Sequence, residues 1–216
     1  METPQHSKHH MYTVGVHSTV AMEQIAPDKI LRLTMLLHDV AKPYCISVDE
    51  KGKEHYYGHP EKGAEMAKDI LRRLKLDNDT IAKVCTLIRW HDDRPALSPR
   101  VIRRMMNRIG VDYFPNLLLV KYADIAAQSD YQRKEKLAYV DELKCGYEET
   151  LQKQECVTLK ALAVDGKDML SLGIAQGKQI GKTLNYLLEQ VLEDPGKNNR
   201  DTLLALAKAF HEKEGE

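Results

Sequence analysis

The sequence contains no apolar run approaching the roughly 20 residues that a membrane-spanning helix requires. Its first residues, Met-Glu-Thr-Pro-Gln-His-Ser, are polar and lack the hydrophobic segment of a signal peptide. We therefore expect no membrane partner and a cytoplasmic location.

The chain also lacks net charge, because 32 acidic residues balance 32 basic ones. No global electrostatic field attracts a polyanion, so any site for nucleic acid must be local. The four cysteines form no C-x-x-C pair and stand at irregular spacings, which favours reduced structural thiols over disulfides or a zinc framework.

Strand signals are almost absent, whereas apolar residues recur at helical spacing from Val14 onwards. We therefore predict an all-α fold, a helical bundle followed by a small helical C-terminal subdomain. A change in composition at Cys156-Val157-Thr158 places the expected domains at residues 1–155 and 156–216. A chain of 216 residues can bury one such core with an appended subdomain.

The most informative stretch is residues 31–43, a nearly all-apolar helix that reaches His38-Asp39 and is expected to end at Pro43. A helix without a wide polar face is surrounded by other helices, so the ionisable pair at its end needs partners. A metal ion suits this pair. The alternative for the dipeptide alone is that His38 caps the helix and Asp39 is solvated.

Other metal-ligating residue types occupy positions where periodicity demands an apolar residue or where a loop can turn inward. They are His17, His59, His91 and Asp124. One histidine on an apolar face is usually a hydrogen-bonded core residue, but so many coincidences would each need a separate partner. With His38 and Asp39 they make six candidate ligands, which exceed one tetrahedral site and suit two neighbouring metals.

The order of these residues resembles the HD superfamily of metal-dependent phosphohydrolases. More specifically, the strings His10-Met-Tyr-Thr-Val with His17, Leu36-Leu-His-Asp-Val-Ala-Lys-Pro43 and His55-Tyr-Tyr-Gly-His59 resemble the HD region of bacterial tRNA nucleotidyltransferases and poly(A) polymerases. The tail from Val164 to Ala205 resembles the end of the same enzymes. Only four residues precede Gln5, so we expect no nucleotidyltransferase domain and no nucleotide addition.

The resemblance implies one metal held by His17, His38, Asp39 and Asp124, with Asp39 bridging to a second metal held by His59 and His91. Manganese, iron, cobalt, nickel or zinc suit these ligands, with magnesium as a further candidate. The expected function is a divalent-metal phosphohydrolase acting on a nucleotide or an RNA-terminal phosphate, including a 2′,3′-cyclic one. Asp39 and Lys42 are the expected catalytic residues.

Lys42, His10, Tyr57 and Arg104 are the residues expected to bind the substrate. Arg100, Arg104 and Arg108 recur at four-residue spacing and form a basic face that could contact RNA, although a solvated helix face explains it equally well. Two alternative functions remain open, a non-catalytic tRNA- or RNA-binding module derived from a nucleotidyltransferase and a di-iron oxygenase of the HD type. The sequence leaves the oligomeric state undetermined.

Overall fold

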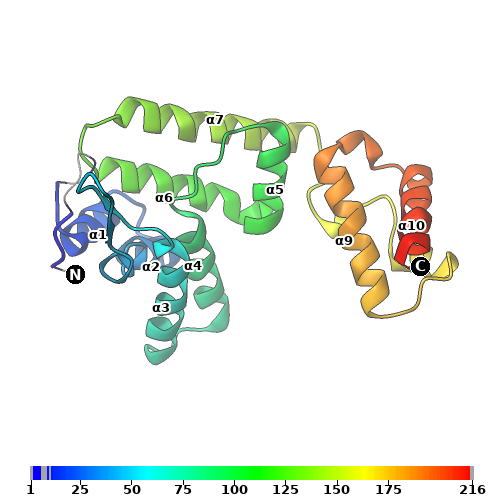
Figure 1. Cartoon of the computed structure of the whole chain (residues 1–216), viewed down its shortest axis with the longest axis horizontal. Helices are drawn as coiled ribbons and strands as arrows, with labels where there is room; N and C mark the ends of the chain where they lie inside the picture. Colours follow the sequence, from blue (N-terminus) through cyan, green and yellow to red (C-terminus); the bar gives the residue numbers. More distant parts are fainter. Residues whose placement is uncertain (1, 6–8, 10, 215–216) are drawn as a thin grey trace. The chain divides into compact units, whose positions relative to one another are not determined.

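The computed structural model describes residues 2–5, 9 and 11–214. Within these residues the chain is all-α, as predicted, and the one sheet consists of two antiparallel two-residue strands (Figure 1). None of the helices in this part of the chain is long and apolar enough to cross a membrane.

The chain divides into two compact units. The first unit comprises Met1–Pro95 and Asp112–Lys144, and the second comprises Ala96–Val111 and Cys145–Glu216. Each unit is thus built from two separate stretches of the chain. A single boundary in the sequence, such as the one expected at residue 155, does not describe these units.

The first unit contains the helices that carry the candidate ligands. Its elements are α1 (Val14–Glu23), α2 (Lys29–Leu37), η1 (Lys42–Tyr44), β1 (Ser47–Val48), β2 (Glu54–His55), α3 (His59–Arg73), α4 (Asn78–Trp90) and α6 (Phe114–Ala126), followed by the first part of α7 (Arg133–Gln152). The short 3-10 helix η2 (Val111–Tyr113) leads into α6.

Side-chain caps set the beginnings of several helices. Asp28 accepts hydrogen bonds from the backbone N–H groups of Ile30 and Leu31, and Asp77 accepts one from Thr80. Ser98 caps α5 (Pro99–Ile109) in the same way. These side chains satisfy N–H groups that have no partner within the first turn, which is why α2, α4 and α5 start where they do.

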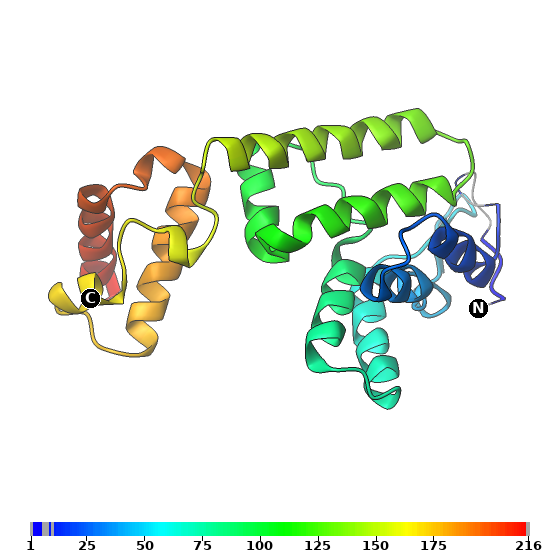
Figure 2. The same cartoon turned by 180° about the vertical axis from the view of Figure 1, so that it is seen from behind.

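Helices α3 and α4 run side by side, as both cartoon views show (Figure 2). Their facing apolar stripes and the end of α2 form one buried cluster. Its members are Leu37, Ala67, Leu71, Ile81, Val84 and Ile88. This cluster packs α2, α3 and α4 together, and a candidate ligand stands at the end of α2, at the start of α3 and at the end of α4.

Helix α2 ends earlier than the sequence indicates. Its last residue is Leu37, and His38 is the C-cap, whereas the helix was expected to continue to Pro43. The backbone then passes through turns into η1. The early end lets both His38 and Asp39 point into the first unit, an arrangement that consecutive positions on a straight helix do not provide.

The second unit consists of α5 (Pro99–Ile109), the end of α7, η3 (Leu159–Ala161), α8 (Gly166–Ser171), α9 (Lys178–Glu193), η4 (Pro195–Lys197) and α10 (Arg200–Glu214). Gly110, with φ +98°, ends α5. Helix α9 packs against both α5 and α10.

Candidate metal centre

Six side chains of metal-ligating type meet inside the first unit. They are His17, His38, Asp39, His59, His91 and Asp124, and each is at most 5% exposed. His17 comes from α1 and Asp124 from α6, whereas the others stand at the ends or starts of α2, α3 and α4. The structure thus brings together every residue expected to bind metal.

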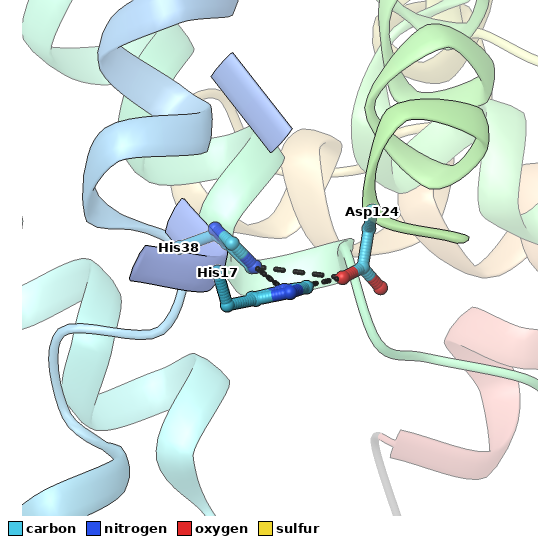
Figure 3. A group of neighbouring side chains, drawn as sticks. All are labelled: His17, His38 and Asp124. Carbon is cyan, nitrogen blue, oxygen red and sulfur yellow. Dashed lines mark hydrogen bonds and ion pairs between the residues drawn. The ribbon is translucent and has the colours of Figure 1, made fainter. Parts of the chain in front are cut away.

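One group forms around His17, His38 and Asp124, which point toward one another (Figure 3). His17 Nε2 lies 3.2 Å from His38 Nε2 and 2.9 Å from Asp124 Oδ1. The distance from His38 Nε2 to the same carboxylate oxygen is 3.6 Å. Three ligand atoms from three separate segments therefore surround one position.

Asp39 joins this group to a second one. Its Oδ2 atom lies 3.3 Å from His38 Nε2, whereas its Oδ1 atom lies 3.5 Å from His59 Nε2 and 3.6 Å from His91 Nε2. His59 and His91 face each other through Nε2 at 3.3 Å. His38, Asp39 and His91 also have ligand atoms close enough to share an ion, so the two groups are continuous.

The histidine rings are oriented by backbone carbonyls. The Nδ1–H groups of His38, His59 and His91 donate to the carbonyls of Met35, Tyr56 and Ile88, each three residues earlier, at 2.7–2.8 Å. His17 Nδ1 lies 3.3 Å from the carbonyl of Ala127. A ring that donates from Nδ1 presents the lone pair of Nε2, which is the arrangement typical of metal-bound histidine.

Two observations indicate that these residues fit a metal centre. Asp39 Oδ1 is buried, faces the Nε2 atoms of His59 and His91, and receives no hydrogen bond of good geometry, whereas Lys42 pairs with Oδ2. In addition, two ligands about 2.1 Å from one ion are separated by about 3.0–3.4 Å at tetrahedral or octahedral angles. The Nε2–Nε2 separations of 3.2 and 3.3 Å fall in that range.

Charges within the group shift the pKa values of its members. Burial alone would lower the pKa of His38, but attraction to Asp39 and a hydrogen bond to Asp124 raise it to about 10. Burial would raise the pKa values of Asp39 and Asp124, yet the neighbouring histidines hold both well below the usual range. The carboxylates are therefore anionic, and a metal ion would take the place of a proton on His38.

Lys42 is a buried partner of Asp39. Its Nζ atom lies 2.7 Å from Asp39 Oδ2 and donates a hydrogen bond to Gln5 Oε1 at 3.0 Å. The side chain is thus directed at the candidate bridging carboxylate, while Gln5 holds it from the N-terminal segment. Sequence reasoning predicted a phosphate-binding role for Lys42 and did not identify Gln5.

The other residues expected to bind substrate lie outside this group. Tyr57 is 76% exposed and stacks on His55, with ring centroids 5.0 Å apart. Arg104 belongs to the second unit, where it pairs with Glu189 and Glu193. His10 lies outside the described residues.

A chain of hydrogen bonds holds the Oδ2 atom of Asp124. Gln128 donates to Asp124 Oδ2 at 2.8 Å, and Lys136 donates to Gln128 Oε1 at 2.7 Å. Arg133 donates to the Gln128 carbonyl. Sequence reasoning did not identify these residues. Their one sequence signal is that Gln128 follows Asp124 by four positions, the spacing of neighbours on a helix.

Comparison with known protein families shows to which family this chain belongs. The family model for tRNA nucleotidyltransferase domain 2 matches residues 61–207. The chain therefore belongs to the tRNA nucleotidyltransferase domain 2 family. No solved structure matches it.

Several curated relatives carry related names. The CC-adding tRNA nucleotidyltransferase of Thermus thermophilus is 32% identical over 75% of this chain and 36% of its own length. The A-adding tRNA nucleotidyltransferase of Deinococcus radiodurans is 29% identical over 84% of this chain and 43% of its own length. The multifunctional CCA protein of Legionella pneumophila is 27% identical over 58% of this chain. The chain thus spans less than half of the length of the first two relatives.

These matches correct the function expected from the sequence. We expected a metal-dependent phosphohydrolase, but the relatives are named for nucleotide addition to tRNA, and none of those above is named as a hydrolase. The expected resemblance to tRNA nucleotidyltransferases is confirmed. Among the alternatives, the RNA-binding module agrees best with this family.

Proposed function

We propose that the chain is an RNA-binding module of the tRNA nucleotidyltransferase type, with a site for divalent transition metals in its first unit. The family match carries the RNA part of this proposal, because it runs from residue 61 to residue 207 and so extends through both compact units. The relatives whose names mention tRNA support tRNA as the RNA that is bound.

The RNA contact is assigned to the face of α5 that carries Arg100, Arg104 and Arg108. Arg100 pairs with Glu193 at 2.7 Å, and Arg104 pairs with Glu189 and Glu193 at 3.3 Å. Exposed ion pairs of this kind contribute only about 0–1 kcal/mol each, so RNA phosphates can replace the carboxylates. Arg108 forms no ion pair with any residue that the structure describes.

The metal site would use His17, His38, Asp39 and Asp124 for one ion and Asp39, His59 and His91 for the other. Imidazole and carboxylate ligands favour manganese, iron, cobalt, nickel or zinc. Ions at this position would balance the negative charge of Asp39 and Asp124 inside the first unit. The Oδ1 atom of Asp39, which faces the Nε2 atoms of His59 and His91, supports this assignment.

Binding of defined tRNA ends tests the proposal. Transcripts that stop before the two terminal C residues, after them, or after the final A are titrated with the protein in a filter-binding assay. A double-stranded DNA of equal charge is the control. We expect tRNA to bind more tightly than the DNA at 150 mM salt, and equal binding would contradict the RNA-binding function.

Metal content is measured on the same preparations by mass spectrometry. The site predicts up to two transition-metal ions per chain. A protein that binds tRNA but never retains metal would leave the RNA part of the proposal intact and disprove the metal part.

A further inference from the structure

Helix α6 carries a second buried polar side chain near the candidate ligand Asp124. Lys121 is 3% exposed and stands three positions before Asp124, so the two side chains share a face of the helix. Sequence reasoning did not identify this lysine. Because a buried ammonium group is costly unless its hydrogens find acceptors, the contacts of Lys121 must explain its position.

Lys121 finds two acceptors at the end of α4. Its Nζ atom donates to the backbone carbonyls of His91 and Asp93 at 2.8 and 2.7 Å. His91 is the C-cap of α4, and carbonyls at the end of a helix lack partners within the helix. A cation is also favoured at this end by the helix dipole. Lys121 therefore caps α4 and ties its end to α6.

His91 is thus held at two points. Its ring donates from Nδ1 to the carbonyl of Ile88 at 2.7 Å, a bond within the last turn of α4. That bond orients the ring relative to its own helix and to nothing else. The bond from Lys121 holds the same turn relative to α6, the helix that carries Asp124. The two bonds together place the His91 ring relative to Asp124.

The loop after α4 has a further anchor on α7. The hydroxyl group of Tyr139 donates to the carbonyl of Pro95 at 3.1 Å. Tyr139, Lys121, His91 and Asp124 also line one narrow hollow in the first unit. The loop is therefore held at both of its ends, and Lys121 is the anchor next to the candidate ligand.

We propose that Lys121 is a positioning residue of the metal centre, which sets the separation between His91 and Asp124. These residues are assigned to different ions, so Lys121 would align the two halves of the centre from a single helix. It acts through the backbone of His91 and touches neither ion. This inference rests on the proposed metal site.

Loss of Lys121 should affect the two ions unequally. Asp124 keeps its own hydrogen bonds to His17 and Gln128 when the lysine is removed. The end of α4 loses the cation that caps it, so the direction of the His91 ring relative to the rest of the centre is no longer fixed. The ion assigned to His91 should therefore be lost first.

Titration of the metal-free chain with cobalt tests this role. Lys121→Met keeps the apolar stem and removes the donors, so we expect the affinity for one ion to fall about 10- to 100-fold while the other ion is retained. Its visible spectrum should resemble that of His91→Ala. Lys83→Met is the matched control, since Lys83 stands on α4 and pairs with Asp79. Unchanged binding of both ions in Lys121→Met, or equal loss of both, would overturn the proposal.

Two further variants separate positioning from a general loss of stability. Lys121→Gln is polar but too short to reach both carbonyls, and it carries the test if Lys121→Met does not fold. It should show the same unequal loss, and two fully occupied sites would contradict the proposal. Gly146→Ala, whose added methyl group would meet Ile102 in the second unit, should keep both ions. Unequal loss in Gly146→Ala as well would make Lys121 a merely structural residue.

Proton NMR of the metal-free chain separates this inference from the proposed metal site. The Nδ1 protons of His38 and His91 are both buried and bonded to carbonyls. In Lys121→Met we expect the His91 proton to exchange with solvent roughly tenfold faster, while the His38 proton is unchanged. This result in a chain that binds no metal would disprove the metal site and leave Lys121 as the residue that holds His91. Equal exchange of the His91 proton in both chains would overturn the role of Lys121, whatever the metal content.

Discussion

Asp39 Oδ1 lies 3.5 Å from His59 Nε2, while the other oxygen of the same carboxylate lies 3.3 Å from His38 Nε2. The two histidines belong to different helices and are separated by 21 positions in the sequence. One carboxylate thus faces both halves of the candidate metal centre, and no other residue in the group does so with two separate atoms. Its removal should affect both halves.

The first prediction is that Asp39→Ala abolishes metal binding. The variant loses a ligand of one ion and the bridge to the other, so the content should fall from up to two ions per chain to nearly none, as measured by mass spectrometry. Asp69→Ala, an exposed position on α3, is the control and should retain the metal. Full metal content in Asp39→Ala would show that the site has been assigned to the wrong residues.

A second prediction concerns Gln128, which holds Asp124 through a hydrogen bond of 2.8 Å. Gln128→Ala should weaken metal binding by about 10- to 100-fold, because a ligand that is free to rotate binds less tightly. Competition with a chromophoric chelator gives the affinity, and the visible spectrum of bound cobalt reports the ligand geometry. Gln152→Ala, at the exposed end of α7, should change neither measurement.

The third prediction uses Glu193, whose carboxylate pairs with both Arg100 and Arg104. Glu193→Gln removes a negative charge from the proposed RNA face, releases Arg100 and leaves Arg104 paired with Glu189 alone. We expect tRNA affinity to rise roughly two- to fivefold at low salt, and the gain should shrink as salt is added.

Glu149→Gln is the matched control for this effect. Glu149, on α7, pairs with Lys153 just after the end of the helix, and not with an arginine of α5. A weaker affinity for tRNA in Glu193→Gln, or the same gain in both variants, would place the RNA contact elsewhere on the chain.

The fourth prediction compares two helical glycines in the second unit. A Cβ atom on Gly146 would come within 2.1 Å of Ile102 Cδ1, whereas a Cβ on Gly181 would meet nothing within 4 Å. Gly146→Ala should destabilise the protein by about 1–3 kcal/mol, because the added methyl group overpacks the contact between α7 and α5.

Gly181→Ala should instead stabilise the protein by about 0.5–1 kcal/mol, through the better helix propensity of alanine. Urea denaturation of both variants gives the two free energies of unfolding. Stabilisation by both substitutions would mean that Ile102 moves aside at little cost.

Local signals account for the parts of the fold that were predictable from the sequence. Ser98 and Gly110 mark both ends of α5, and Asp77 marks the start of α4. The predicted end of α2 at Pro43 is wrong, although proline is a strong stop signal. The helix ends at Leu37, and the turns that follow place His38 and Asp39 in the interior of the first unit.

The candidate site likewise contains residues that the sequence could identify and contacts that it could not. His17, His91 and Asp124 could be selected from the sequence, because a polar residue on an otherwise apolar helix face stands out. Contacts between distant segments could not be selected in this way. Lys42 binds Gln5 across 37 positions, and Arg100 binds Glu193 across 93. Charge patterning on one helix therefore predicted a free basic face on α5, which α9 partly neutralises.

Three histidines of the site donate hydrogen bonds to the carbonyls three residues earlier, and these bonds would persist after an ion leaves. Each ring is held by its own turn of backbone, so its direction is independent of the ion. Loss of the ion would leave the rings in place, and a different ion could then be taken up without any refolding. The cell's supply of transition metals, more than the shape of the protein, would then decide which element is found there.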